Sequence, residues 1–146
     1  MESKESIGRL LGCLHRQAQK YLHREFSKLE LGSGTHLFLM LLHHQDGITQ
    51  NELTTRAHID KAHTTRAIQR LVELGYISRE KDEHDQRAYR IFLTDKAHKI
   101  MPEIKRVLKM WTAIISNGFS ETEVKQTLSL LSKMSENAVK YMEDQG

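Results

Sequence analysis

Residues 82–94 read DEHDQRAYRIFLT, and this stretch decides the fold because its character changes in the middle. Its first half is charged, whereas its second half has the apolar residues Tyr89, Ile91 and Leu93 at every second position, which is the spacing of a half-buried β-strand. A shorter strand is expected just before it, over residues 76–79. Two strands joined by a polar loop make a β-hairpin, so residues 82–88 are predicted to form its solvent-exposed tip.

The segment before this hairpin has the spacing of a helix-turn-helix. Residues Thr49 to Glu52 form a capping-box sequence, so a short helix is expected to begin there and to end near Ala57. Asp60 can cap a second helix that ends at Gly75. The buried face of that second helix is predicted to carry Thr64, Ile68 and Leu71. Two helices joined so closely, followed directly by a hairpin, predict a winged helix-turn-helix.

Long amphipathic helices are expected on both sides of this core, because apolar residues recur at helical spacing over residues 7–29 and 124–141. Between the first of these and the helix-turn-helix, residues 37–42 are apolar on all sides, which predicts a short buried helix. A further helix should run from Thr94 to Trp111. The expected fold class is therefore mainly α, of the α+β type, with a winged helix-turn-helix between long N- and C-terminal helices.

The composition fits one soluble domain, because 146 residues supply one hydrophobic core but not two. No stretch approaches the ~20 apolar residues of a membrane span, and residues 1–17 lack the apolar region of a secretory signal. The single cysteine, Cys13, excludes an intramolecular disulfide and fits a reducing compartment. We therefore expect a cytoplasmic protein with no membrane partner. The net charge of +3 permits a polyanionic partner without requiring one.

From Thr35 to Leu108 the motifs resemble the MarR/SlyA family of winged helix-turn-helix regulators. The wing motif of that family is Asp-x-Arg, five residues, then Leu-Thr, and here it is carried by Asp85, Arg87, Leu93 and Thr94. The upstream matches are TQNEL at residues 49–53, TTR at 64–66 and LVELGYI at 71–77.

The resemblance implies an obligate homodimer in which the terminal helices intertwine and hold two winged domains on adjacent turns of double-stranded DNA. Residues 1–146 would then form a single MarR-type domain. Residues 1–34 and 112–146 would be dimerisation helices, and residues 35–111 would be the DNA-binding region.

The exposed face of the predicted recognition helix has residue types that contact DNA. Arginine suits bidentate contacts with phosphate and guanine, and six arginines lie between Arg56 and Arg90. Lys61 and the helix start at residues 49–51 are expected to hold phosphates, while Arg66 and its neighbours read bases. The predicted DNA-binding residues are Lys61, His63, Thr65, Arg66, Gln69, Arg70, Asp85 and Arg87.

Asp85 and Arg87 stand two residues apart at the tip of the hairpin. The Asp85 carboxylate is expected to accept hydrogen bonds from loop amides or from the Arg87 guanidinium, and so to hold Arg87 extended. An arginine held in this way fits the narrow minor groove, and the resemblance gives Arg87 the same role. The alternative is an exposed ion pair worth ~0–1 kcal/mol and nothing else. For Arg79 and Arg90, a solvated strand end is an equal alternative to DNA contact.

The nine histidines and the single cysteine contain no metal-binding motif, so neither a metal nor a cofactor is expected. No nucleophile paired with a base is visible either, so an enzyme is not expected. The hypothesis is a transcriptional repressor that binds a pseudo-palindromic operator and is relieved by a small aromatic or anionic effector. Two alternatives remain open: an effector-independent architectural DNA-binding dimer, and a redox sensor acting through Cys13.

Overall fold

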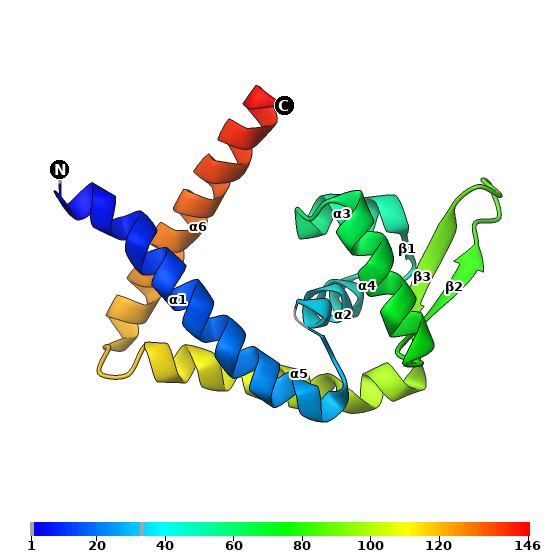
Figure 1. Cartoon of the computed structure of the whole chain (residues 1–146), viewed down its shortest axis with the longest axis horizontal. Helices are drawn as coiled ribbons and strands as arrows, with labels where there is room; N and C mark the ends of the chain where they lie inside the picture. Colours follow the sequence, from blue (N-terminus) through cyan, green and yellow to red (C-terminus); the bar gives the residue numbers. More distant parts are fainter. Residues whose placement is uncertain (1, 33) are drawn as a thin grey trace. The chain divides into compact units, whose positions relative to one another are not determined.

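The computed structural model describes residues 2–32 and 34–146, which form two compact units, Met1–Lys109 and Met110–Gly146. Figure 1 shows a largely helical chain with one small sheet. The helices are α1 (Glu2–Phe26), α2 (Thr35–His44), α3 (Gln50–Ala57), α4 (Lys61–Glu73), α5 (Asp95–Ile115) and α6 (Glu121–Gln145). The strands are β1 (Ile48–Thr49), β2 (Ile77–Lys81) and β3 (Tyr89–Leu93). The predicted fold class is confirmed.

The first helix ends one turn earlier than its apolar spacing predicts. A 3₁₀ turn, η1 (Ser27–Leu29), follows α1, and Glu30 then adopts a left-handed conformation with φ of 60°. The tighter turn closes with a hydrogen bond from the Glu30 amide to the Ser27 carbonyl at 3.1 Å. Because Leu31 is buried at only 3 % exposure, this turn directs the chain back into the core of the first unit.

The core of the first unit forms around α2. Phe38, Leu39 and Leu42 are fully buried, which explains why this helix is apolar on all sides. They share the interior with buried side chains of α3, α4, β3 and α5, namely Leu53, Ile68, Leu71, Ile91 and Ile104. Burying each large apolar side chain contributes about 1.5–3 kcal/mol, so α2 anchors the helix-turn-helix.

Side-chain caps fix the starts of the helices as the sequence predicts. The Thr49 hydroxyl accepts the Glu52 amide at 3.2 Å at the start of α3, and Asp60 Oδ1 accepts the His63 amide at 2.7 Å at the start of α4. In the second unit, Ser120 and Glu123 form a complete capping box at the start of α6. Each cap satisfies backbone donors that the first helical turn leaves without partners.

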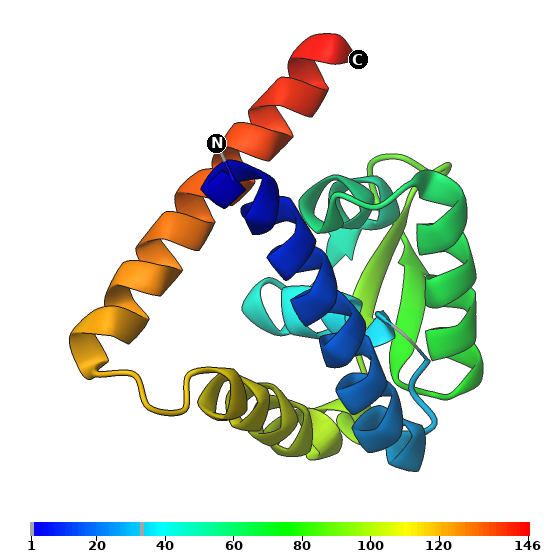
Figure 2. The ribbon, with the colours of Figure 1, turned by 60° about the vertical axis from the view of Figure 1, so that its left-hand side comes forward.

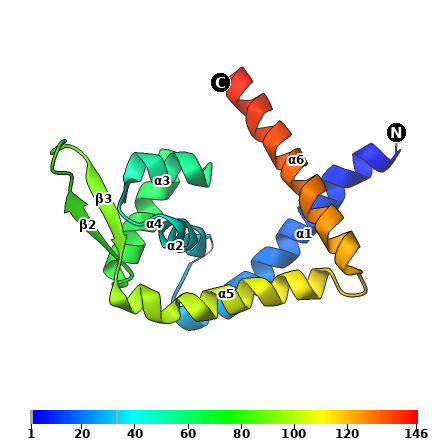
Figure 3. The same cartoon turned by 180° about the vertical axis from the view of Figure 1, so that it is seen from behind.

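The sheet has three antiparallel strands in the order β1-β3-β2, where the sequence predicted only two. The missed strand is β1, which pairs Ile48 with Ile91. Two residues are too short to show any alternation, so no periodicity could have revealed this strand. The predicted strand at residues 76–79 is also shifted and lengthened to Ile77–Lys81. Figure 3 shows the β2–β3 hairpin, the wing, projecting beyond the helices of the first unit.

The loop before β1 ties the wing to the helix-turn-helix. The Asp46 carboxylate accepts the Leu93 amide at 2.9 Å, and the Gly47 amide donates to the Ile91 carbonyl at 2.9 Å. Gly47 has φ of 74°, and a Cβ added there would meet the Phe92 ring at 2.9 Å. Only glycine therefore fits this close approach without displacing Phe92.

Apolar side chains remain exposed on the terminal helices of both units. On α1 they are Ile7, Leu10, Leu11 and Leu14, at 39–55 % exposure. In the second unit they include Ile114, Phe119, Leu128, Leu130, Leu131, Met134, Tyr141 and Met142. Exposed apolar side chains that recur along a helix in this number are more than the scattered surface residues that need no explanation. Among the described residues no helix is both long enough and apolar enough to span a membrane.

Candidate nucleic-acid interface

The recognition helix α4 divides cleanly into a buried and an exposed face. Thr64, Ile68 and Leu71 are buried, as their helical spacing predicts, and Ala67 is buried with them. The Thr64 hydroxyl donates to the Asp60 carbonyl at 2.9 Å. The exposed residues are Lys61, Ala62, His63, Thr65, Arg66, Gln69, Arg70 and Glu73. Figure 2 shows α4 beside α3 and followed directly by the wing, which is the order a winged helix-turn-helix requires.

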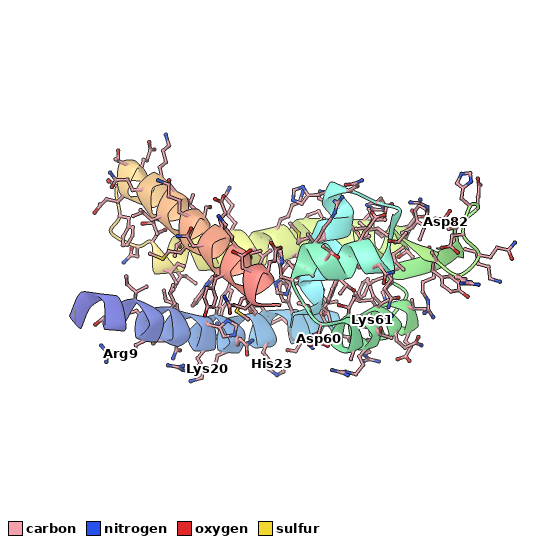
Figure 4. The ribbon with its side chains drawn as sticks, turned by 90° about the horizontal axis from the view of Figure 1, so that it is seen from above. Arg9, Lys20, His23, Asp60, Lys61 and Asp82 are labelled. Atoms are coloured by element: carbon pink, nitrogen blue, oxygen red, sulfur yellow. The ribbon has the colours of Figure 1, made fainter. Side chains whose placement is uncertain are left out.

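Three exposed basic side chains at the start of α4 are free to meet a ligand. Across residues 2–32 and 34–146, the Lys61 ammonium, the His63 ring and the Arg66 guanidinium have no hydrogen bond or ion pair. Figure 4 marks Lys61 beside the capping residue Asp60 at the start of the helix. Free donors on one face of a helix are suited to phosphate and guanine acceptors.

The exposed residues at the other end of α4 are held by neighbours. The Arg79 guanidinium on β2 donates to Gln69 Oε1 at 3.2 Å, and Gln69 Nε2 donates to Glu73 Oε1 at 3.4 Å. Arg70 also pairs with Glu73 at 3.6 Å. These side chains would have to exchange partners to contact DNA. The sequence did not reveal the Gln69–Arg79 contact, because it joins a helix to a strand ten residues away.

The tip of the wing is organised by Asp85. Its Oδ1 accepts the Arg87 amide at 3.0 Å, and its carbonyl accepts the Ala88 amide at 3.0 Å, which closes a turn. Of the two partners expected for Asp85, the loop amide is therefore the one it binds. Within the described part of the chain, the exposed Arg87 guanidinium has no partner.

A second carboxylate, Asp82, braces the base of the same loop. Arg90 pairs with Asp82 at 3.3 Å and also donates to the Gly47 carbonyl at 2.7 Å. The His84 amide, which donates to Asp82 at 3.0 Å, holds the pKa of this carboxyl below its usual range, and Arg90 adds to the effect. Figure 4 marks Asp82 on the wing. Arg90 therefore has a structural partner on each side, a role the sequence left open.

Lys61 of α4 and Arg87 of the wing meet around a hollow of about 230 Å³. It is lined by Thr49, Gln50, Asn51, Lys61, Arg87, Ala88 and Tyr89. The first turn of α3 supplies backbone N–H groups and the positive end of a helix dipole, while Lys61 and Arg87 supply full charges. This combination fits an anionic group such as a phosphate.

The sequence and fold of the chain match known regulators. A sequence model of the MarR family matches residues 33–89, from two residues before α2 to the first residue of β3. The HTH-type transcriptional regulator BilQ of Clostridioides difficile (strain CD3) is 30 % identical over 127 residues, which are 87 % of this chain and 86 % of that protein. This chain belongs to the MarR family of transcriptional regulators.

Solved structures agree with this MarR-family assignment. A MarR transcriptional regulator from Methanosarcina mazei Go1 superposes with a TM-score of 0.89 at 39 % identity, covering 94 % of this chain and 99 % of that one. A MarR family regulator from Listeria monocytogenes, solved in complex with a 26mer DNA, has a TM-score of 0.82 at 28 % identity and covers 88 % and 86 % of the two chains.

In this MarR-family chain the predicted site residues fall into two groups. Lys61, His63 and Arg66 lie with free side chains at the start of α4, and Lys61 and Arg87 line the same hollow. Gln69 and Arg70 are tied to Glu73 and Arg79 instead. Thr65 and Asp85 are engaged through their own hydrogen bonds. So are Gln50, which belongs to the helix start expected to hold phosphates, and Arg90, whose role the sequence left open.

Proposed function

We propose that the chain is a homodimeric repressor that binds a pseudo-palindromic operator in double-stranded DNA. The observation that carries this proposal is the hollow where Lys61, Arg87 and the first turn of α3 meet. A phosphate of the DNA backbone fits there, while α4 enters the adjacent major groove. The Listeria monocytogenes relative in complex with DNA supports the same partner.

Each basic residue has a distinct proposed role. Arg66 and His63 read base edges, and Arg66 has the bidentate geometry for guanine. Lys61 and the amides of α3 position the backbone, which carries no sequence information. Arg87, held out by the turn at Asp85, enters the minor groove beside the recognition helix and senses its width.

Dimerisation is proposed through residues 1–34 and 112–146, with residues 35–111 as the DNA-binding region. The exposed apolar side chains of α1 and α6 support this division, because a single chain leaves them uncovered. A two-fold dimer would place its recognition helices about 34–36 Å apart, one turn of DNA, which is why the operator would be pseudo-palindromic.

Control is proposed through a small aromatic or anionic effector that favours a different spacing of the two recognition helices. Such a ligand weakens DNA binding only by its differential affinity for the two spacings. The redox alternative rests on Cys13, whose side chain is exposed on α1. The alternative of an architectural DNA-binding dimer requires neither an effector nor oxidation of Cys13.

A selection experiment tests these proposals. The full-length chain is incubated with a random-sequence duplex library, and bound DNA is recovered and sequenced. Enrichment of one pseudo-palindrome supports the repressor, whereas tight binding without enrichment supports the architectural alternative. The enriched complex is then titrated with phenolic acids to detect a small-molecule effector. Separate titrations with peroxide, on wild type and on Cys13→Ser, detect a redox signal. Release by peroxide from wild type only would favour the redox sensor.

A further inference from the structure

The hydroxyl of Thr65 on the exposed face of α4 is already committed to other protein groups. It donates its single hydrogen to the Lys61 carbonyl at 2.8 Å and accepts a hydrogen bond from Gln50 Nε2 at 3.0 Å. A bond from threonine to the carbonyl four residues back is common in helices. The bond from Gln50 is different, because it comes from the neighbouring helix α3 and fixes the rotamer of Thr65.

This commitment limits what Thr65 can do in a major groove. A hydroxyl has one donor hydrogen, so Thr65 cannot donate to a base without giving up the Lys61 carbonyl. Breaking a satisfied hydrogen bond to make an equivalent one yields little net free energy. The hydroxyl oxygen keeps one further lone pair as an acceptor, and the γ-methyl group is the apolar group available at this exposed position.

The neighbouring polar side chain with base-reading geometry is committed as well. Reading adenine requires the amide oxygen and nitrogen of Gln69 together, and these are bound to Arg79 and Glu73 respectively. The free donors beside Thr65 are those of Arg66 and His63. The start of α4 therefore presents an unpaired arginine next to a methyl group whose orientation is fixed.

We propose that Thr65 contacts the 5-methyl group of a thymine through its γ-methyl group, and so makes thymine a preferred base at one position of each operator half-site. The inference rests on the proposed function and adds to it a chemical requirement on the DNA. Thymine is distinguished in the major groove by this methyl group, and apolar contact is the way a protein recognises it. The Gln50 side chain has a positioning role in this contact, because it holds Thr65 in this rotamer.

Deoxyuridine provides a direct test, because it keeps every hydrogen-bonding group of thymidine and lacks only the methyl. The full-length chain is titrated with the duplex recovered from the random-sequence selection, in which each thymine of one half-site is replaced singly by deoxyuridine. In wild type, one replacement should weaken binding about fourfold, the value of one buried methyl group.

Two variants of Thr65 separate its methyl from its hydroxyl. Thr65→Ser keeps the hydroxyl and both of its hydrogen bonds, and should bind thymine and deoxyuridine duplexes equally. Thr65→Val keeps a methyl group at the same place and should retain the fourfold ratio. Since each variant is compared with itself on two duplexes, partial loss of active protein cancels.

Two results would overturn the inference while leaving the proposed function intact. The first is an enriched duplex that tolerates deoxyuridine at every position in wild type. The second is an unchanged ratio in Thr65→Ser; if the ratio is also lost in Thr65→Val, the hydroxyl makes the contact. Failure to enrich any duplex would instead overturn the proposed sequence-specific function itself.

Discussion

Asp85 holds the backbone of Arg87 and leaves its guanidinium free: the Asp85 carboxylate accepts the Arg87 amide at 3.0 Å, and no described residue pairs with the Arg87 side chain. The carboxylate therefore shapes the turn, while the arginine supplies the charge. An acidic residue at a loop that approaches phosphates is then explained by the geometry it imposes.

Replacing Asp85 tests this division. Asp85→Ala removes an acceptor for the Arg87 amide, so it should weaken DNA binding at least tenfold, about 1.4 kcal/mol, although it also removes a negative charge. Asp85→Asn is the matched control, because its Oδ1 can still accept the amide, and binding should be retained. Fluorescence anisotropy on the selected duplex measures both. Tighter binding by Asp85→Ala would mean that simple charge repulsion governs the wing.

Two arginines of the same wing should respond in opposite ways. Arg87→Ala should weaken DNA binding at least tenfold with the thermal midpoint nearly unchanged, since its guanidinium has no partner within the described chain. Arg90→Ala should lower the stability by about 1 kcal/mol, because it leaves Asp82 and the Gly47 carbonyl without their partner. Thermal unfolding and anisotropy on both variants provide the comparison. Equal losses of stability in Arg87→Ala and Arg90→Ala would contradict this expectation.

Arg66 and Lys61 should differ in how they depend on DNA sequence. Arg66→Ala should cost about 1–3 kcal/mol on the selected duplex and relax base choice, because a bidentate base contact is lost. Lys61→Ala should weaken binding to all duplexes alike and reduce the salt slope by about one, because one phosphate contact is lost. Titrations at several salt concentrations, on selected and random duplexes, distinguish them. If Arg66→Ala lost the same affinity on the selected and the random duplexes, the assignment of Arg66 to base contact would be wrong.

The pattern of exposure on α6 predicts a dimer that does not dissociate into a folded monomer. Sedimentation at low micromolar concentration should show one dimeric species. Leu128→Glu places a charge where the side chain is now 58 % exposed and apolar, and should abolish the dimer. Gln126→Glu introduces the same charge on another face of the helix and should leave it unchanged. A well-folded wild-type monomer at that concentration would rule out the proposed interface.

The half-buried His36 should make the fold sensitive to acid. Its ring packs against Phe26 with centroids 4.7 Å apart, and its Nδ1 is buried without a partner among the described residues. Burial lowers its pKa below the ordinary value of about 6.5. Above pH 6.5 the His36 ring is neutral in the folded and the unfolded chain. As the pH falls below 6.5, the unfolded chain binds a proton at His36 before the folded chain does, so the free energy of unfolding decreases.

His36→Phe should therefore flatten the dependence of the unfolding free energy on pH between about pH 5 and pH 7. Denaturant unfolding at several pH values measures the effect. Some dependence should remain in His36→Phe, because burial and the nearby Lys105 also lower the pKa of His43. An identical pH profile in wild type and His36→Phe would contradict the assignment.

The helices of this fold were predictable because their signals are local. Thr49 and Asp60 cap the helices they immediately precede, and the buried face of α4 follows from a spacing of three and four residues. β1 was not predictable, because two residues show no period and the strand exists only through its pairing with β3.

The candidate site was only partly predictable for a similar reason. Residue types placed Lys61, Arg66 and Arg87 on exposed positions correctly, since exposure follows from the helical and hairpin patterns. Which side chains are already engaged depends on contacts between separate elements, such as Gln69 with Arg79 and Gln50 with Thr65. Sequence spacing does not reveal contacts of that kind.

The short strand β1 and the loop before it fix the wing to the helix-turn-helix. Asp46 and Gly47 bind the backbone of β3 at Leu93 and Ile91, and Arg90 returns a bond to the Gly47 carbonyl. The wing and the helix-turn-helix would therefore travel as one rigid piece, so that the arginine at its tip reaches DNA at a fixed offset from α4. Lengthening or shortening the hairpin would then change the distance between Arg87 and α4 without rebuilding the recognition helix.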